Sequence, residues 1–271
     1  MVKIVLKSFW YKYQERYQEI KSVLCVGLDP EFGQLPESAK KAANPIWEFN
    51  QAIIESTAEF ACAYKPNLAF YLADGMRGLD ALYKTVEFIP ENIPVILDAK
   101  IGDIGNTMTA YLSAFFADLK VDAITLNPLM GSDVMQPIQE RDAFAFVLCL
   151  TSNPSAADFL KEGMAEKIAD WLQNFPEENF GAVIGATYST NLKAMRNLLR
   201  NRILLIPGIG AQGGDLKTVL QEAKDSFATP NILVNSSRGI IFASRGNDFA
   251  SAAGKEARRL TLEMKDALSK E

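Results

Sequence analysis

Short apolar runs recur along the whole chain, and this repeat limits the possible folds more than any other feature. The segments between the runs are mostly long enough for a helix, as in residues 52–59 and 165–172. Apolar runs of this length are typical of parallel strands that are buried on both faces. The runs occupy residues 23–28, 60–64, 95–97, 123–126, 144–150, 181–185, 203–206 and 231–234.

Eight strand and helix units in 271 residues predict an α/β protein with the fold of a TIM (β/α)8 barrel. An open, doubly wound sheet is the structural alternative. We expect one domain, in which residues 23–243 form the barrel core. Residues 1–22 would add an N-terminal helical extension, and residues 244–271 a C-terminal helix.

Apolar residues at helical spacing mark both terminal helices. The first helix is predicted to pack across the bottom of the barrel. Its apolar positions are Phe9, Tyr13, Tyr17 and Ile20. Those of the last helix are Leu260, Met264 and Leu268.

Polar or conformationally special residues follow the apolar runs. In a parallel barrel the carboxyl ends of the strands share one face, where active sites are built, so these side chains are expected to converge. The simpler alternative is that a strand has to end in something polar. The residues are Asp29, Lys65, Asp98 with Lys100, Asn127, Thr151 with Ser152, Thr187, Pro207 with Gly208, and Asn235.

The segment Asp98-Ala99-Lys100-Ile101-Gly102-Asp103 has the greatest concentration of charge at these ends. Strand alternation sends Asp98 and Lys100 to the same face, and Gly102 lets the backbone turn before Asp103. An ammonium between two carboxylates is expected to stay protonated, so Lys100 could donate a proton but would be a poor nucleophile. A salt-bridge ladder at the barrel rim is the alternative for this motif taken alone.

The chain contains no histidine, and this excludes several kinds of catalytic site. Ser-His-Asp and Cys-His arrangements are impossible, so proton chemistry falls to lysine, carboxylates, tyrosine or water. The three cysteines, Cys25, Cys62 and Cys149, lie inside apolar runs without paired spacing. We therefore expect neither disulfides nor a zinc site.

The distribution of charge and apolar residues also limits the partners. A net charge of −5 with scattered lysines and arginines gives no basic stripe for nucleic acid and no polybasic membrane anchor. No apolar run approaches the roughly 18 residues of a membrane span, and the first residues do not resemble a signal peptide. We expect a cytoplasmic protein that binds neither nucleic acid nor membranes.

Two glycine-containing loops follow the seventh and eighth apolar runs, at residues 206–215 and 235–240. Glycines free backbone N–H groups to face an anion, and Arg238 can hold phosphate oxygens bidentately. The loops after the last two strands are the usual phosphate site of this barrel, so we predict one here. Gln212 and the glycines around it also suit a loop that closes over a ligand.

In this order along residues 23–243, the motifs resemble the orotidine 5′-phosphate decarboxylase family, in particular its longer bacterial branch. The family's Asp-x-Lys-x-x-Asp signature matches Asp98, Lys100 and Asp103. Further matches are Asp29 within 26–30, Lys65 within 64–67, Thr107, and the segments 152–154, 210–214 and 237–239.

The resemblance implies loss of CO₂ from orotidine 5′-monophosphate to give UMP, the last step of pyrimidine nucleotide synthesis, with Lys100 protonating C6. It implies no cofactor and no metal. It also implies a homodimer in which Asp103 and Thr107 reach into the partner's site. The implied catalytic residues are Lys100, Asp98, Asp103 and Lys65. The implied substrate-binding residues are Asp29, Lys65, Thr107, Ser152, Pro207, Gln212, Gly213, Ser237 and Arg238.

Three rival functions remain open at this stage. The first is a Mg²⁺-dependent aldolase or decarboxylase of the same superfamily. Such a site would need a histidine as its general acid, and this chain has none. The second is a Schiff-base aldolase using Lys65 or Lys100, which flanking carboxylates oppose because that chemistry needs a lowered lysine pKa. The third is a catalytically silent barrel that binds nucleotides.

Overall fold

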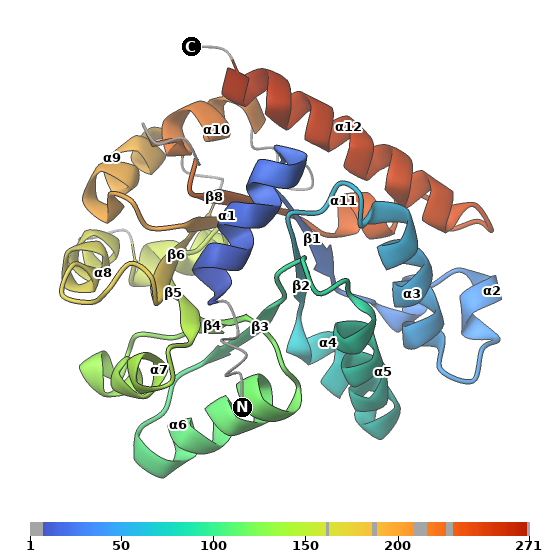
Figure 1. The fold of residues 1–271 in the computed structure, drawn as a ribbon, viewed down its shortest axis with the longest axis horizontal. Helices are drawn as coiled ribbons and strands as arrows, with labels where there is room; N and C mark the ends of the chain where they lie inside the picture. Colours follow the sequence, from blue (N-terminus) through green and yellow to red (C-terminus); the bar gives the residue numbers. More distant parts are fainter. Residues whose placement is uncertain (1–7, 161–162, 186–188, 209–215, 226–229, 270–271) are drawn as a thin grey trace, which may run out of the picture.

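Parallel strands alternate with helices in the computed structural model, which describes residues 8–160, 163–185, 189–208, 216–225 and 230–269 (Figure 1). The strands begin close to the predicted apolar runs. They are β1 Leu24–Leu28, β2 Ala63–Pro66, β3 Ile96–Ile101, β4 Ala123–Leu126, β5 Phe144–Leu150, β6 Phe180–Ile184, β7 Leu204–Pro207 and β8 Ile232–Ser236.

The strands form one closed barrel. They pair in the order β2-β1-β8-β7-β6-β5-β4-β3, and all the paired strands are parallel. Two parallel bridges, Tyr64 with Val95 and Asn67 with Asp98, join β2 to β3 and close the ring. The predicted TIM barrel is therefore confirmed, and the open sheet is excluded.

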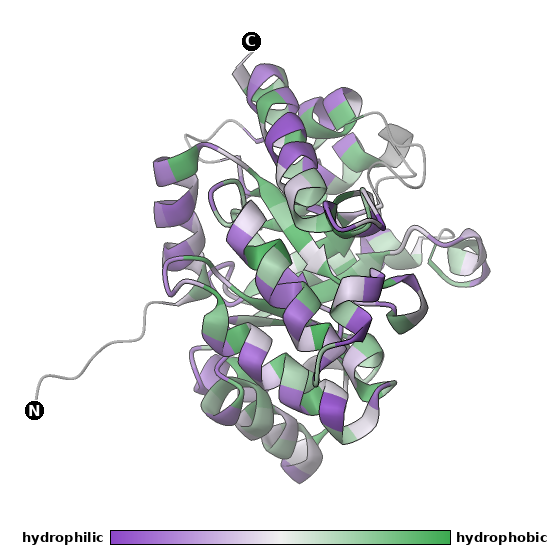
Figure 2. Ribbon diagram, turned by 90° about the vertical axis from the view of Figure 1, so that its right-hand side faces the viewer, coloured by the Kyte–Doolittle hydropathy of each residue, from purple (hydrophilic) through white to green (hydrophobic). Residues whose placement is uncertain are grey.

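Helices surround the strands, and their apolar faces point towards the barrel (Figure 2). The longer helices are α1 Phe9–Ile20, α3 Pro45–Thr57, α5 Gly75–Phe88, α6 Gly105–Leu112, α8 Met164–Leu172, α9 Ser189–Leu199, α10 Leu216–Ala223 and α12 Phe249–Ser269. Shorter ones are α2 Glu37–Lys40, α4 Leu68–Leu72, α7 Gln136–Glu140 and α11 Arg238–Ile241. None of the described helices is long and apolar enough to cross a membrane.

Helix α1 closes the amino-terminal end of the barrel, as its apolar spacing predicts. The Phe9 ring lies 4.6 Å from that of Phe144 and 5.3 Å from that of Phe146, measured between ring centroids. The Tyr13 hydroxyl donates to the Ile232 carbonyl at 3.1 Å and accepts from the Ile232 N–H at 3.2 Å. Burial of these aromatic side chains makes the lower interior apolar.

Helix α12 matches the helix predicted at the other end of the chain. Leu260 and Met264 are buried, and the helix packs along α3 beside α10 and α11 (Figure 1). The apolar face of α12 lies against the barrel helices. Neither terminal helix therefore covers the carboxyl ends of the strands.

Two strand boundaries differ from those expected from hydropathy. β2 begins at Ala63 because Phe60 belongs to the turn after α3, where its N–H donates to the Thr57 carbonyl. β3 does not end at Leu97 but continues to Ile101, whose pairing with Leu126 extends the strand through the charged motif. Asp98 and Lys100 thus lie within a strand rather than just after one.

Candidate active site

Three side chains form a chain of alternating charge inside the upper barrel. The Lys65 ammonium donates to Asp98 Oδ2 at 2.8 Å, and the Lys100 ammonium donates to Asp98 Oδ1 at 2.5 Å. Lys65 and Asp98 are largely buried, whereas the Lys100 side chain is 49% exposed. Lys100 is therefore the member of the cluster that a ligand above the barrel can reach.

Burial and ion pairing have opposite effects on the pKa of Asp98 and on the pKa of Lys65. Burial raises the pKa of the Asp98 carboxyl, but the Lys65 and Lys100 ammoniums outweigh it and hold that pKa well below its usual range. Burial lowers the pKa of the Lys65 ammonium, but Asp98 and Asp29 outweigh it and raise that pKa. At neutral pH both groups are therefore charged.

We expect Asp98→Asn to destabilise the fold at neutral pH by about 3–5 kcal/mol, because the buried Lys65 ammonium loses its partner. The depressed pKa of Asp98 means that its ionic contribution is complete above the unfolded pKa of about 4 and is lost as the pH falls further. Urea unfolding of parent and variant should therefore differ most at pH 6 and differ less at pH 3. A difference that stays the same at both pH values would contradict this assignment. Asp80→Asn, at an exposed ion pair with Lys84, is the control and should change stability little.

The backbone of β3 is irregular at the motif. Lys100 has a φ of +49°, in the left-handed region. Among the described strands, it is the one residue with a positive φ of this kind. This conformation costs an ordinary residue about 1–2 kcal/mol. The pairing of β3 with β4 shifts register between Leu97 and Ile101. The sequence places the turn at Gly102, but the left-handed residue is Lys100.

Gly102 has a different role, which is to permit close approach of two strand ends. A Cβ atom at this position would lie 2.6 Å from the Asn127 carbonyl oxygen, and the Asn127 N–H donates to the Ile101 carbonyl at 2.7 Å. Only glycine leaves room for this contact. The contact fixes where β3 ends and where the loop carrying Asp103 begins.

Asp103 and Thr107 lie apart from the charge cluster within one chain. The Asp103 carboxylate accepts from the Ile104 N–H at 2.8 Å and makes no ion pair with another described residue. Thr107 is exposed on α6. The expectation that Lys100 lies between two carboxylates is therefore wrong for a single chain, because the loop after Gly102 carries Asp103 away from Lys100.

Oxygen atoms of Asp29, Asn235 and Ser237 line the neighbouring wall, at the ends of β1 and β8. Asp29 Oδ1, Asn235 Oδ1 and Ser237 Oγ are buried and have no hydrogen-bond partner among the described residues. A Cβ on Gly27 would lie 2.6 Å from Ser237 Cβ, so glycine lets the segment after β8 approach β1. Buried polar atoms without partners are costly, and a ligand with hydroxyl groups could satisfy them.

Other predicted residues that the structure describes follow the strands at the same end of the barrel. Ser152 is half-buried after β5, Pro207 ends β7 beside Asn235, and Arg238 is exposed at the start of α11. Gln212, Gly213 and Thr187 lie outside the described residues. The structure thus brings residues from β1, β2, β3, β5, β7 and β8 to one end of the barrel.

Thr125 is a neighbour of the cluster that the sequence did not single out. Its hydroxyl donates to Asp98 Oδ1 at 2.9 Å and accepts from the Lys100 N–H at 2.8 Å. A signal was present, because Thr125 is the one polar residue in the run 123–126 and shares its face with Ala123 and Asn127.

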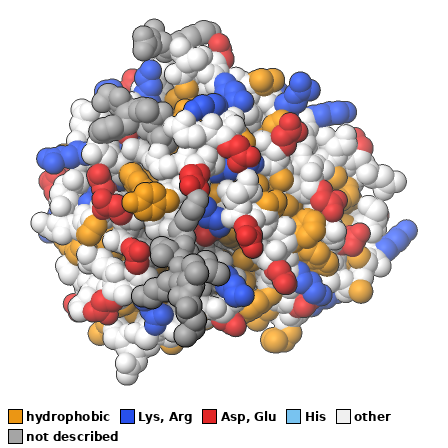
Figure 3. Space-filling view, in the orientation of Figure 1, with side chains coloured by type: hydrophobic (Ala, Val, Ile, Leu, Met, Phe, Trp, Pro, Cys, Tyr) orange, Lys and Arg blue, Asp and Glu red, His pale blue; other side chains and the backbone are white. Residues whose placement is uncertain are grey.

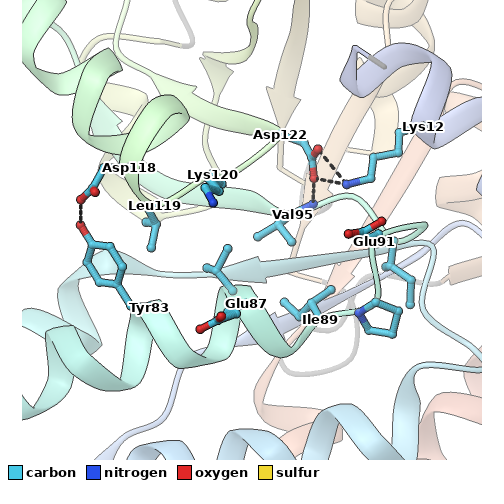
Figure 4. A pocket seen from close by; sticks show the side chains of 13 residues that line it. Lys12, Tyr83, Glu87, Ile89, Glu91, Val95, Asp118, Leu119, Lys120 and Asp122 are labelled. Atoms are coloured by element: carbon cyan, nitrogen blue, oxygen red, sulfur yellow. Dashed lines mark hydrogen bonds and ion pairs between the residues drawn. The ribbon is translucent and has the colours of Figure 1, made fainter. Parts of the chain in front are cut away.

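A second concave region lies at the opposite, amino-terminal end of β3 and β4, with a volume of about 320 Å³ (Figure 4). Among the side chains that line it, Lys12 pairs with Asp122 and the Tyr83 hydroxyl donates to Asp118. Positive and negative side chains are interspersed over the α1 side of the molecule (Figure 3). Within the described ranges, no three His, Cys, Asp or Glu side chains cluster as metal ligands.

Comparison with known proteins gives one consistent family. A model described as the orotidine 5′-phosphate decarboxylase / HUMPS family matches residues 22–253. The orotidine 5′-phosphate decarboxylase of Herpetosiphon aurantiacus is 45% identical over 263 residues, covering 92% of this chain and 95% of that protein. The enzyme of the same name from Leptospira interrogans is 42% identical over 264 residues, covering 93% and 94%.

Solved structures agree with these sequence relatives. The structure of Leishmania donovani OMP decarboxylase superposes with a TM-score of 0.81 at 36% identity, covering 96% of this chain and 98% of that one. The likeness therefore extends over nearly the whole length of both chains.

Proposed function

The chain belongs to the orotidine 5′-phosphate decarboxylase / HUMPS family, and on this basis we propose that it converts orotidine 5′-monophosphate to UMP and CO₂ in pyrimidine synthesis. The observation that supports this most directly is the Lys65–Asp98–Lys100 chain of charges at the carboxyl ends of the strands. It supplies an accessible ammonium beside a carboxylate that is kept ionised.

In the proposed reaction the bond from C6 of the pyrimidine to its carboxylate breaks, and the electron pair stays on C6 as CO₂ leaves. The Lys100 ammonium stabilises the developing carbanion and then transfers a proton to C6. Solvent returns a proton to the neutral amine. Asp98 faces the departing carboxylate and holds the Lys100 ammonium in position.

A comparison of energies indicates that Lys100 contributes more by stabilising the carbanion than Asp98 does by repelling the substrate carboxylate. Two like charges 4 Å apart repel by about 4 kcal/mol at an effective dielectric constant near 20. Enzymes commonly lower barriers by roughly 8–23 kcal/mol. Repulsion between Asp98 and the substrate carboxylate is therefore too small to be the main effect. Most of the rate enhancement has to come from charge stabilisation that exists only in the transition state.

The substrate's ribose and phosphate supply binding energy away from the reacting carbon. The unpartnered Asp29 oxygen and the Lys65 ammonium are suited to the ribose 3′-hydroxyl, and Ser152 to the pyrimidine edge. Pro207, Ser237 and Arg238, with Gln212 and Gly213, would form the phosphate site. No cofactor or metal is needed in this scheme.

A homodimer completes the proposed site, with Asp103 and Thr107 entering the partner's site to hold the ribose 2′-hydroxyl. Exposed apolar side chains follow β2, β3, β4 and β5, around the mouth of the barrel. They are Leu72, Met76, Ile104, Leu129, Met130 and Phe159. Apolar groups gathered on one face are typical of an interaction surface. Their position beside Asp103 supports a dimer that is formed through this face.

We place the enzyme in the cytoplasm. Cys25, Cys62 and Cys149 are buried as free thiols, which is the usual state of cysteine in a reducing compartment. The scattered surface charge gives no reason to expect a nucleic-acid or membrane partner.

The function is tested by following the absorbance of orotidine 5′-monophosphate with the purified chain, with and without EDTA. We expect loss of the substrate signal and formation of UMP at equal rates in both conditions. Activity that requires a divalent cation would favour the metal-dependent branch of the superfamily. No reaction in either condition would favour a silent nucleotide-binding barrel.

We expect Arg238→Ala to weaken UMP binding by about 10- to 100-fold, because a charge-assisted bond to phosphate is lost. Uridine, which has no phosphate, should bind the variant and the parent equally. Titration calorimetry with both ligands measures this difference. An equal loss for uridine would argue against a phosphate role. Arg245→Ala, which removes an exposed arginine bonded to Gln34, is the matched control.

A further inference from the structure

We propose that Thr125 is a positioning residue for the decarboxylation, fixing both the backbone of Lys100 and the orientation of the Asp98 carboxylate. This inference deepens the proposed function and rests on Lys100 acting as the proton donor. Thr125 is 2% exposed on β4, so its hydroxyl acts through its neighbours and not by contact with bulk solvent.

The first contact replaces a backbone hydrogen bond. Between Leu97 and Ile101 the pairing of β3 with β4 is interrupted, and the Lys100 N–H donates to Thr125 Oγ1 at 2.8 Å. The same residue has the positive φ of +49°. A strained backbone conformation persists only where its surroundings fix it, and this bond ties the strained residue to the neighbouring strand.

The second contact orients the carboxylate. Thr125 Oγ1 donates to Asp98 Oδ1 at 2.9 Å, the oxygen that also accepts from the Lys100 ammonium. Lys65 holds the other oxygen. The hydroxyl therefore accepts a hydrogen bond from the main chain of Lys100. It donates one to Asp98, the ion-pair partner of the Lys100 side chain. Loss of the hydroxyl removes one restraint on the Lys100 main chain and one on the Asp98 carboxylate that the Lys100 ammonium contacts.

Valine and serine separate the hydroxyl from the shape of the side chain. Thr125→Val keeps the branched shape but has no hydroxyl, whereas Thr125→Ser keeps the hydroxyl. Thr85→Val is the control, because Thr85 is equally buried and its hydroxyl accepts from Asn50 rather than bonding to Asp98 or Lys100.

The experiment measures kcat with orotidine 5′-monophosphate and the Kd of two ligands, UMP and a UMP analogue with an ionised oxygen at C6. We expect Thr125→Val to lower kcat by about 10- to 100-fold, as a small misplacement of a catalytic group does. Its affinity for the analogue should fall by a similar factor, while its affinity for UMP changes by less than about threefold. Thr125→Ser should stay within about threefold of the parent in all three quantities, and so should Thr85→Val.

Three results would overturn the proposal. They are an unchanged kcat in Thr125→Val, equal weakening of UMP and the analogue, and a serine variant as impaired as the valine variant. A parent chain that does not decarboxylate the substrate would refute the proposed function instead. The two failures are therefore distinguishable in the same set of measurements.

Discussion

Lys100→Ala is expected to lower kcat for decarboxylation by a factor of about 10⁴ or more, because both charge stabilisation and proton donation are lost. UMP should still bind, since the proposed ribose and phosphate contacts come from other strands. The fold should tolerate the change, because the Lys100 side chain is 49% exposed and Asp98 keeps its bond to Lys65.

Single-turnover kinetics and UMP titration of the same preparation measure the two quantities. Lys84→Ala is the matched control, because Lys84 is similarly exposed and pairs with Asp80 on α5. Robust decarboxylation by Lys100→Ala would disprove the role of Lys100. Loss of UMP binding together with turnover would indicate a general disruption of the site.

Mixing two inactive variants is expected to restore activity if the site is shared between subunits. Homodimers of Lys100→Ala and of Asp103→Ala should both be inactive. A heterodimer pairs the intact Lys100 of one chain with the intact Asp103 of the other. It should recover one working site of two, or about half the activity of the parent dimer.

The structure provides the matched control for this complementation. Lys65 and Lys100 contact the same Asp98 within one chain. Heterodimers of Lys65→Ala with Lys100→Ala should therefore remain inactive, since each site has lost one lysine. Differently tagged subunits allow purification of the heterodimer before assay. An inactive Lys100→Ala/Asp103→Ala heterodimer would contradict the shared site.

Much of the fold could be predicted because strand burial follows directly from apolar runs. The barrel, the closing helix at Phe9 and Tyr13, and the final helix agree with the periodicity of the sequence. Boundaries were less predictable, as β2 and β3 show. Hydropathy does not reveal that β3 continues through a charged motif, because that depends on pairing with β4.

The candidate site was predictable for a related reason. The carboxyl ends of the parallel strands lie on one face of the barrel, so the residues that follow each apolar run could be expected to meet there. Thr125 was missed because it lies inside a strand and not at its end. The place of Asp103 was also beyond local sequence rules, because Asp103 follows Gly102, whose close approach to Asn127 is a tertiary contact.

The sequence by itself determined the eight-strand repeat, the absence of histidine and the types of residue available for chemistry, because these are properties of composition and spacing. Only the tertiary structure decided that, within one chain, the described ion pairs of the charge cluster join Lys65, Asp98 and Lys100 and do not include Asp103. It also decided that Lys100 has the left-handed backbone conformation and is tied to Thr125. The physical reason is that these features depend on register between strands distant in sequence, which neighbouring residues do not specify.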